Sequence, residues 1–351
     1  MNFLQSLIRP HLIELTPYAS ARDEYKGSEG IFLDANENPF GSVSGDAYNR
    51  YPDPHQVAIK EKLARLKKVN ASQIFLGNGS DEAIDLLIKT FCEPKIDNIV
   101  ILPPTYGMYK VCADIQQVEV LSATLTANFD LDTEKIQETV NEHTKMIWVC
   151  SPNNPSGNLV NQDKIRLLLD KYPNKMVVVD EAYIDFVPEK TWLNELKKYP
   201  NLIVLQTFSK AWGMAGLRIG VAYAHAEIIQ ILNKIKYPYS LNILTQKAVL
   251  DALNFEDRKN EMVKQLNELR EKLREQLSML PFVTHIYPSD SNQLLVRVNQ
   301  PSELFRYLIE QKIIVRDRSK VILCEGCLRI SVGSEEENDS LVQEMKRWAN
   351  Q

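Results

Sequence analysis

Short apolar segments alternate with amphipathic helical patterns from about residue 73 to residue 224, and this alternation constrains the fold more than any other feature. Several segments are continuously apolar and end at turn residues, as strands do when helices cover both faces of their sheet. The pattern therefore predicts a large α/β domain with a mostly parallel, seven-stranded sheet flanked by helices. The expected strands are 73–76, 98–102, 117–121, 146–150, 176–179, 202–206 and 219–224.

A smaller C-terminal α+β domain is expected after this region. Apolar residues recur at helical spacing from Met262 to Leu280 and stop before Pro281, which predicts a helix that links or packs the two domains. Residues 1–30 have the pattern of an N-terminal arm that packs with the small domain. We therefore divide the chain into 1–30, 31–250 and 251–351, with the site between the two domains. Strands are expected at 293–298, 313–316 and 328–332, and helices at 302–311 and 335–348.

Composition excludes several functional classes. The 351 residues carry a net charge of −5 with both signs interspersed, and the basic stretch Lys60–Lys68 fits a solvated helix face better than a nucleic-acid patch. No apolar run approaches the ~18 residues of a membrane helix, and the N-terminus lacks the features of a signal peptide. The five scattered cysteines suit reduced thiols in a cytoplasm. Cys324 and Cys327 form a lone CxxC, for which we expect two half-buried thiols and no metal.

The segment from Thr207 to Gly220 has the strongest chemical signature. Lys210 lies in a Ser-Lys-Ala turn that is followed by three glycines, Gly213, Gly216 and Gly220, and Arg218 lies eight positions beyond the lysine. A lysine that forms a Schiff base needs a well-held turn and a setting that lowers its pKa. A hydroxyl and an arginine nearby suit a dianionic phosphate, and glycines let the backbone approach it. The alternative is a glycine-rich loop with an ordinary surface lysine.

Gly77-Asn-Gly-Ser-Asp-Glu82 follows a predicted strand and opens a predicted helix at 82–91. Free N–H groups at a helix N-terminus bind anions, and glycines allow a phosphate to approach closely. The alternative is a plain helix cap by Ser80 or Asp81. Together with Lys210 and Arg218, the segment favours a phosphate site.

Three further strand ends carry polar or aromatic residues. Asp180 directly follows strand 176–179, and a buried carboxylate there would keep a pyridine nitrogen protonated. Tyr183 could reach a phenolic oxygen on the same ring. Asn154 lies in the rigid loop after strand 146–150, at the edge where open α/β sheets bind ligands. Tyr106, after strand 98–102, could stack on the ring. The alternatives are a helix cap by Asp180, a bare turn, and a core or surface tyrosine.

Two arginine positions in the C-terminal region suggest binding of anionic substrates. Arg329 lies in the apolar strand Cys327–Ser331 and needs a partner there, either a substrate carboxylate gripped by two N–H groups or a structural salt bridge. Arg316, Asp317 and Arg318 concentrate charge nearby, which suits a second anionic group.

The order and spacing of these residues resemble fold-type I aminotransferases over nearly the whole chain. Finer motifs resemble the histidinol-phosphate aminotransferase family, of which the YPDP element and the late LRISVG discriminate most. Asp34 departs from the asparagine usual in that family, and we expect no chemical consequence. The motifs are LDANENP from Leu33, NRYPDP from Asn49, SPNNPSG from Ser151, VVVDEAY from Val177, FSKAWGMAGLRIG from Phe208, VRD from Val315 and CLRISVG from Cys327.

The resemblance implies a fold-type I, pyridoxal-phosphate-dependent transferase that exchanges an amino group between L-histidinol phosphate and 2-oxoglutarate in histidine biosynthesis. It implies that Lys210 holds the cofactor covalently and moves the substrate Cα proton, while Asp180 pairs with the ring nitrogen. Asn154 and Tyr183 would bind the phenolic oxygen, and Tyr106 would stack on the ring. The cofactor phosphate would be bound by Ser209, Arg218 and the backbone amides of Ser80 and Asp81, helped by Tyr51 of the partner subunit in a homodimer. Gly79 and Thr207 would also belong to the cofactor site.

The resemblance also divides substrate binding between two groups of residues. Arg329 would bind the carboxylate of glutamate, whereas Arg316, with Tyr18 and Asn36, would bind the phosphate end of histidinol phosphate. Related chemistry leaves three alternatives: an aromatic-amino-acid transaminase, a threonine-phosphate decarboxylase, and a non-catalytic regulator. The regulator is disfavoured because such proteins carry a fused DNA-binding domain, for which few residues precede Asp34.

Overall fold

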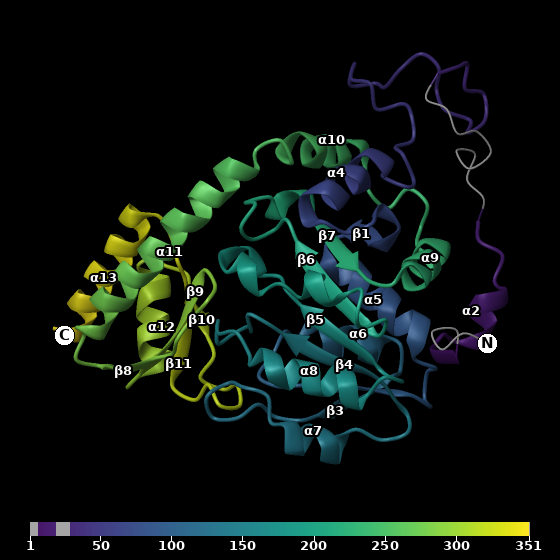
Figure 1. The fold of residues 1–351 in the computed structure, drawn as a ribbon. Coiled ribbons are helices and arrows are strands. Elements are labelled where there is room, and N and C mark those ends of the chain that lie inside the picture. The colour runs from purple at the N-terminus through teal and green to yellow at the C-terminus, as the bar shows by residue number, and fades with distance from the viewer. Residues whose placement is uncertain (1–5, 19–28, 351) are drawn as a thin grey trace.

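The central sheet of the computed structural model, which describes residues 6–18 and 29–350, has seven strands in the order β1-β7-β6-β5-β4-β2-β3 (Figure 1). Neighbouring strands from β3 to β6 are parallel, and β7 runs antiparallel to both β6 and β1. The predicted mostly parallel sheet is therefore confirmed. The strands are β1 (Ile74–Asn78), β2 (Asn98–Ile101), β3 (Glu119–Ser122), β4 (Thr144–Cys150), β5 (Met176–Asp180), β6 (Leu202–Thr207) and β7 (Ile219–Tyr223).

Helices bury both faces of this sheet, which explains why its strands read as continuous apolar runs. In β5, Val177 and Val179 point into one apolar core while Met176 and Val178 point into the other. Strand side chains alternate between faces, so a strand covered on both sides is apolar at every position. One core includes side chains from α4 (Val57–Lys67), α7 (Thr133–Thr139), α8 (Gln162–Lys171) and α10 (Ile243–Ala252), and the other from α2 (Pro10–Glu14), α5 (Ser80–Phe91), α6 (Met108–Ile115) and α9 (Ala226–Ile235).

The C-terminal lobe is built on a four-stranded antiparallel sheet in the order β10-β11-β9-β8, with its own apolar core. Its first helix begins at Glu256. The predicted start was Met262, because the first turns of the helix are polar and show no apolar stripe. The strand expected at 313–316 was wrong: only Arg316–Asp317 pair with a neighbour. The elements are α11 (Glu256–Ser278), β8 (Val283–Ile286), β9 (Gln293–Val298), α12 (Pro301–Glu310), β10 (Arg316–Asp317), β11 (Cys327–Ser331) and α13 (Glu335–Ala349).

Both polar and apolar contacts hold this lobe against the large lobe. The loop before β9 binds the loop after β4: Asp290 accepts the Leu159 N–H at 2.7 Å, and its own N–H donates to the Gly157 carbonyl at 2.8 Å. At a second place, Val263 of α11 packs in a small apolar cluster with Tyr183 and Ala211. The linking helix therefore contacts two of the loops that carry predicted site residues. The exact domain boundaries remain a prediction.

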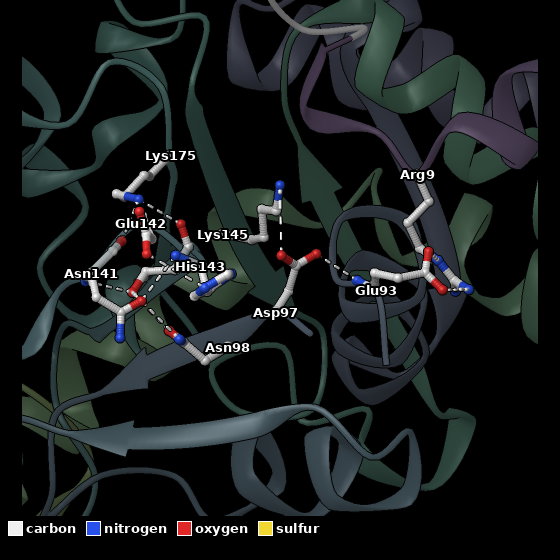
Figure 2. Close-up of polar contacts among 10 residues, drawn as sticks. Arg9, Glu93, Asp97, Asn98, Asn141, Glu142, His143, Lys145 and Lys175 are labelled. Carbon is white, nitrogen blue, oxygen red and sulfur yellow. Dashed lines mark hydrogen bonds and ion pairs between the residues drawn. The ribbon is translucent and has the colours of Figure 1, made fainter. Parts of the chain in front are cut away.

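The opposite, amino-terminal edge of the sheet is tied by a polar network (Figure 2). Asp97, just before β2, accepts the Glu93 N–H at 2.7 Å and pairs with Lys145 of β4 at 3.7 Å. Lys175 donates to the carbonyls of Asn141 and Thr144, at 2.8 Å each. Arg9 pairs with Glu93 at 3.0 Å and so anchors the start of α2, which belongs to the predicted N-terminal arm. These contacts connect the amino ends of the strands and the loops before them. The carboxyl ends of the strands lie at the opposite edge, where a ligand could bind.

Three structural findings concern the expectations about membrane helices, metal sites and cysteines. No helix in the described part of the chain is long and apolar enough to cross a membrane. Within residues 6–18 and 29–350, no group of three or more His, Cys, Asp or Glu side chains could hold a metal ion. All five cysteines are free and buried. Cys324 and Cys327 are 0% exposed, so the expectation of half-buried thiols was wrong.

Candidate active site

A cavity of about 640 Å³ lies at the carboxyl ends of β4, β5 and β6, and β10 and β11 of the small lobe close one side of it. Parallel strands place their carboxyl ends at one edge, so residues far apart in sequence meet there. Twelve of the predicted site residues line this cavity: Ser80, Asp81, Tyr106, Asn154, Asp180, Tyr183, Thr207, Ser209, Lys210, Arg218, Arg316 and Arg329.

The N-terminus of α5 forms one end of the cavity. The helix begins at Ser80, two residues before the predicted start, and Gly79 precedes it with φ +79° and no side-chain cap. A Cβ on Gly220 would lie 2.1 Å from the Ser80 nitrogen, so only glycine allows β7 to approach the helix this closely. Arg218 pairs with Asp81 at 3.4 Å beside the same N-terminus. Free N–H groups and a guanidinium in this arrangement can bind an anion such as a phosphate.

Hydroxyl groups extend this anion site toward Lys210. Thr207 Oγ1 donates to Ser209 Oγ at 3.0 Å and accepts the Ser209 N–H at 3.1 Å, which fixes the turn that leads to the lysine. Tyr106 Oη donates to Asp81 Oδ1 at 3.0 Å, so the ring of Tyr106 is held over the cavity.

Asp180 is a carboxylate that is 2% exposed at the end of β5. The Ala182 N–H donates to its Oδ1 at 3.1 Å, and Tyr109 Oη donates to its Oδ2 at 2.5 Å. Burial raises the pKa of Asp180 to about 6, although both hydrogen bonds oppose the shift. A buried carboxylate with this raised pKa is suited to pair with a cationic ligand atom.

Sequence reasoning missed Tyr109 altogether. Its one sequence signal is its position three residues after Tyr106, near the start of a helix that follows a site loop. Sequence reasoning also left Arg318 without a role of its own, although it noted the charge cluster there. In the structure Arg318 lines the cavity together with Arg316 and Arg329.

Lys210 projects into the cavity with its ammonium 5.5 Å from the centre of the Tyr183 ring. Burial lowers the pKa of Lys210, and the positive charge of Arg329 lowers it further. A larger neutral fraction makes this amine a better nucleophile and base. Burial also raises the pKa of Tyr183, so its hydroxyl stays protonated and can donate a hydrogen bond.

Arg329 extends from β11 into the cavity and donates from Nη1 to Asn154 Oδ1 at 2.6 Å. Its Nε is buried without a hydrogen-bond partner. The structural salt bridge considered for Arg329 is not found among the described residues, and Arg316, its partner in the β10–β11 register, likewise has no ion pair there. The side chain is half-buried, and its buried Nε–H requires an acceptor, which an anionic ligand would supply.

The remaining predicted residues lie outside this cavity within one chain. Tyr51 is half exposed and stacks on Tyr239 with ring centroids 4.4 Å apart. Tyr51 lines two other hollows, one with Tyr18 and one with Asn36. Tyr18 is 74% exposed. A single chain therefore does not bring Tyr18, Asn36 or Tyr51 to Lys210.

Comparisons with known proteins agree with this geometry. Residues 27–345 match the family of class I and II aminotransferases. A histidinol-phosphate aminotransferase of Cytophaga hutchinsonii is 54% identical over 98% of this chain and 99% of its own length. The crystal structure of the histidinol-phosphate aminotransferase from Clostridium acetobutylicum has a TM-score of 0.80 at 24% identity, covering 86% of this chain and 91% of that one.

A further solved structure is that of a histidinol-phosphate aminotransferase from Sinorhizobium meliloti in complex with pyridoxal 5′-phosphate. It has a TM-score of 0.79 at 21% identity and covers 97% of this chain and 96% of that one. At this identity it supports the fold, whereas the full-length relative carries the family assignment. The chain belongs to the class I and II aminotransferases and, within them, to the histidinol-phosphate aminotransferase family.

Proposed function

We propose that this protein binds pyridoxal 5′-phosphate and transfers an amino group between L-histidinol phosphate and 2-oxoglutarate, giving imidazole acetol phosphate and L-glutamate. The supporting observation is one cavity that combines Lys210, the buried Asp180, a helix N-terminus with Arg218, and further arginines without ion-pair partners among the described residues. Each of these groups has a partner in the proposed cofactor or in one of the two substrates.

The residues that line the cavity fit the proposed cofactor. The amino end of α5 has no side-chain cap and lines the cavity, with Arg218 and Ser209 beside it, so it could bind the cofactor phosphate. Asp180 would pair with the ring nitrogen because it is the buried carboxylate of this cavity. Asn154 and Tyr183 would bind the phenolic oxygen, and Tyr106 would cover one face of the ring.

The cofactor, when bound, supplies a carbonyl carbon that receives the amino group and a ring that withdraws electrons. Lys210 would hold the cofactor through Nζ and, once displaced by the incoming amine, would take the proton from the substrate Cα. Asp180 would hold a proton at the ring nitrogen. Tyr183 and Asn154 would fix the ring's tilt relative to Lys210 Nζ, and the α5 N-terminus would anchor the phosphate.

The two substrates differ in their anionic groups, and we predict that two arginines share the recognition. Histidinol phosphate has a phosphate and no carboxylate, whereas glutamate has carboxylates only. Arg316→Ala should raise the KM for histidinol phosphate, since a lost charged contact costs roughly 2–5 kcal/mol. Arg329→Ala should mainly slow the glutamate half-reaction. Single-turnover absorbance measurements follow the half-reactions separately, and equal damage to both by both variants would contradict this division.

The proposed active form is a homodimer whose sites are completed across the interface. Residues 31–43 extend away from the large lobe (Figure 1), and Ile31, Leu33 and Phe40 are 91%, 88% and 96% exposed. Apolar side chains exposed together in this way need a partner surface. A second copy would cover them and could bring Tyr51 of the partner subunit to the cofactor phosphate, and Tyr18 and Asn36 to the substrate.

Mixing two inactive variants would test the shared site. Lys210→Ala and Tyr51→Ala chains should each be impaired, and mixed dimers should recover part of the activity because one of their two sites has both residues intact. The mixture is prepared by joint refolding, and differently tagged chains verify the heterodimers. Verified heterodimers without recovered activity would mean that each site is contained in one chain.

A two-substrate assay tests the proposed reaction itself. Purified protein should convert L-histidinol phosphate with 2-oxoglutarate at a higher kcat/KM than phenylalanine. A preference for phenylalanine would indicate an aromatic-amino-acid transaminase. Release of carbon dioxide from threonine phosphate without amino transfer would indicate a decarboxylase.

We also propose a cytoplasmic location. All five cysteines are free thiols, which fits a reducing compartment.

A further inference from the structure

Tyr109 approaches the site from within the protein, and the reaction described above does not use it. Its side chain is 0% exposed. Its ring stacks on Trp148 with centroids 4.8 Å apart and meets Tyr106 edge-on at 5.6 Å. These two contacts hold the ring, and its hydroxyl donates to Asp180 Oδ2 at 2.5 Å. The hydroxyl is therefore aimed at one oxygen of the carboxylate that would bind the cofactor ring.

We propose that Tyr109 is a positioning residue, whose hydroxyl orients the Asp180 carboxylate and favours its ionised form, so that this carboxylate can pair with a protonated pyridine nitrogen. The inference rests on the proposed cofactor. Tyr109 itself would not touch the cofactor, because its side chain is fully buried behind Asp180.

The hydrogen bonds of Asp180 specify both its orientation and its charge. Oδ2 accepts from Tyr109, and Oδ1 accepts from the Ala182 N–H at 3.1 Å. Rotation of the carboxylate would break both bonds. Both partners are donors, so they suit the ionised carboxylate, which only accepts. A distance of 2.5 Å is typical of a hydroxyl that donates to a charged oxygen.

The electrostatic surroundings make this donor important. Burial raises the pKa of Asp180 and so favours the neutral acid, whereas the Tyr109 hydrogen bond lowers it. Burial and then the charge of Asp180 raise the pKa of Tyr109 well above its ordinary value, so Tyr109 remains a donor at neutral pH. The other groups that face the carboxylate are Asp81, which raises its pKa, Lys210, which lowers it, and Cys150, Tyr106 and Tyr183.

Cofactor binding by the apoprotein separates a positioning role from simple packing. Tyr109→Phe keeps the ring and removes only the hydroxyl. Wild-type and variant apoproteins are titrated with pyridoxal 5′-phosphate and with its 1-deaza analogue, in which a carbon replaces the ring nitrogen. We expect the variant to bind pyridoxal 5′-phosphate about tenfold more weakly or worse. Its affinity for the analogue should not change, because the analogue offers Asp180 no protonated nitrogen.

The pH dependence of binding gives a second readout. Without the hydroxyl, the pKa of Asp180 should rise, so the loss of affinity at low pH should begin at a higher pH in Tyr109→Phe than in the wild type. Tyr199→Phe is the matched control, since it removes a buried hydroxyl without a partner, in the turn before β6 at the far edge of the sheet. This control should leave both affinities and the pH profile unchanged.

The melting temperature of each apoprotein establishes that it is folded. Unchanged affinity for both ligands in Tyr109→Phe, or equal weakening for both, would overturn the positioning role and leave the proposed function intact. Wild-type protein that binds neither ligand would overturn the proposed cofactor, and this inference with it.

Discussion

Lys210→Ala is expected to abolish transamination, with a fall in kcat of about four orders of magnitude or more, because the same amine would hold the cofactor and move the Cα proton. The structure supports this assignment: Lys210 projects into the cavity with a lowered pKa, on a turn fixed by Thr207 and Ser209. Steady-state assays with histidinol phosphate and 2-oxoglutarate measure the loss.

Chemical trapping tests the same residue without turnover. Borohydride reduction of the cofactor-loaded wild-type protein, which we expect to be yellow, should attach the cofactor to the peptide that contains Lys210. Peptide mass spectrometry identifies the modified residue. Lys197→Ala, a change of an exposed lysine on the opposite side of β6, should retain both activity and trapping. Attachment to any lysine other than Lys210 in the wild-type protein would refute the assignment.

Asp180→Ala is expected to lower kcat by about three orders of magnitude, since a buried charge pair at the ring nitrogen is worth several kcal/mol and ~1.4 kcal/mol is tenfold. Asp180→Asn provides the sharper comparison. Asparagine keeps the shape and can still accept the Ala182 N–H, but it carries no charge. Both variants should remain folded and nearly inactive. Near-normal turnover of Asp180→Asn would mean that Asp180 serves only to hold the turn after β5.

The pH dependence of stability provides an independent check on Asp180. Burial raises its pKa from the ordinary value of 3.8 to about 6 in the folded apoprotein. The folded state therefore binds its proton more tightly than the unfolded state does, and the resulting stabilisation is lost as pH rises through about 6. As the pH rises from 3.8 to about 6, the melting temperature of the wild-type apoprotein should fall relative to that of Asp180→Asn. Parallel curves for the two proteins would contradict the raised pKa.

The large sheet and most of the cavity could be predicted from the amino-acid sequence. Alternating apolar strands and helices predict parallel strands, and parallel strands bring their carboxyl ends to one edge. Asn154, Asp180 and Lys210 each follow such a strand, so their meeting could be predicted without coordinates. Local signals were weaker in the small lobe. Strand β8 is half exposed and lacks a clear apolar alternation, and the first turns of α11 are polar, so neither was found.

Contacts between elements that are distant in sequence depend on packing, and they could be identified only from the three-dimensional structure. Tyr109 looks like a core tyrosine in the sequence, and only the packing of its ring on Trp148 of β4 directs its hydroxyl at Asp180 of β5. Asn154 and Arg329 meet only because the small lobe docks on the loop after β4. Asn36 and Tyr51 lie in family motifs, and the family resemblance also assigns Tyr18 to the site, yet one chain leaves all three outside the cavity. Sequence periodicity determines which face of an element is buried, whereas the contact of one side chain with another depends on how whole elements pack in three dimensions.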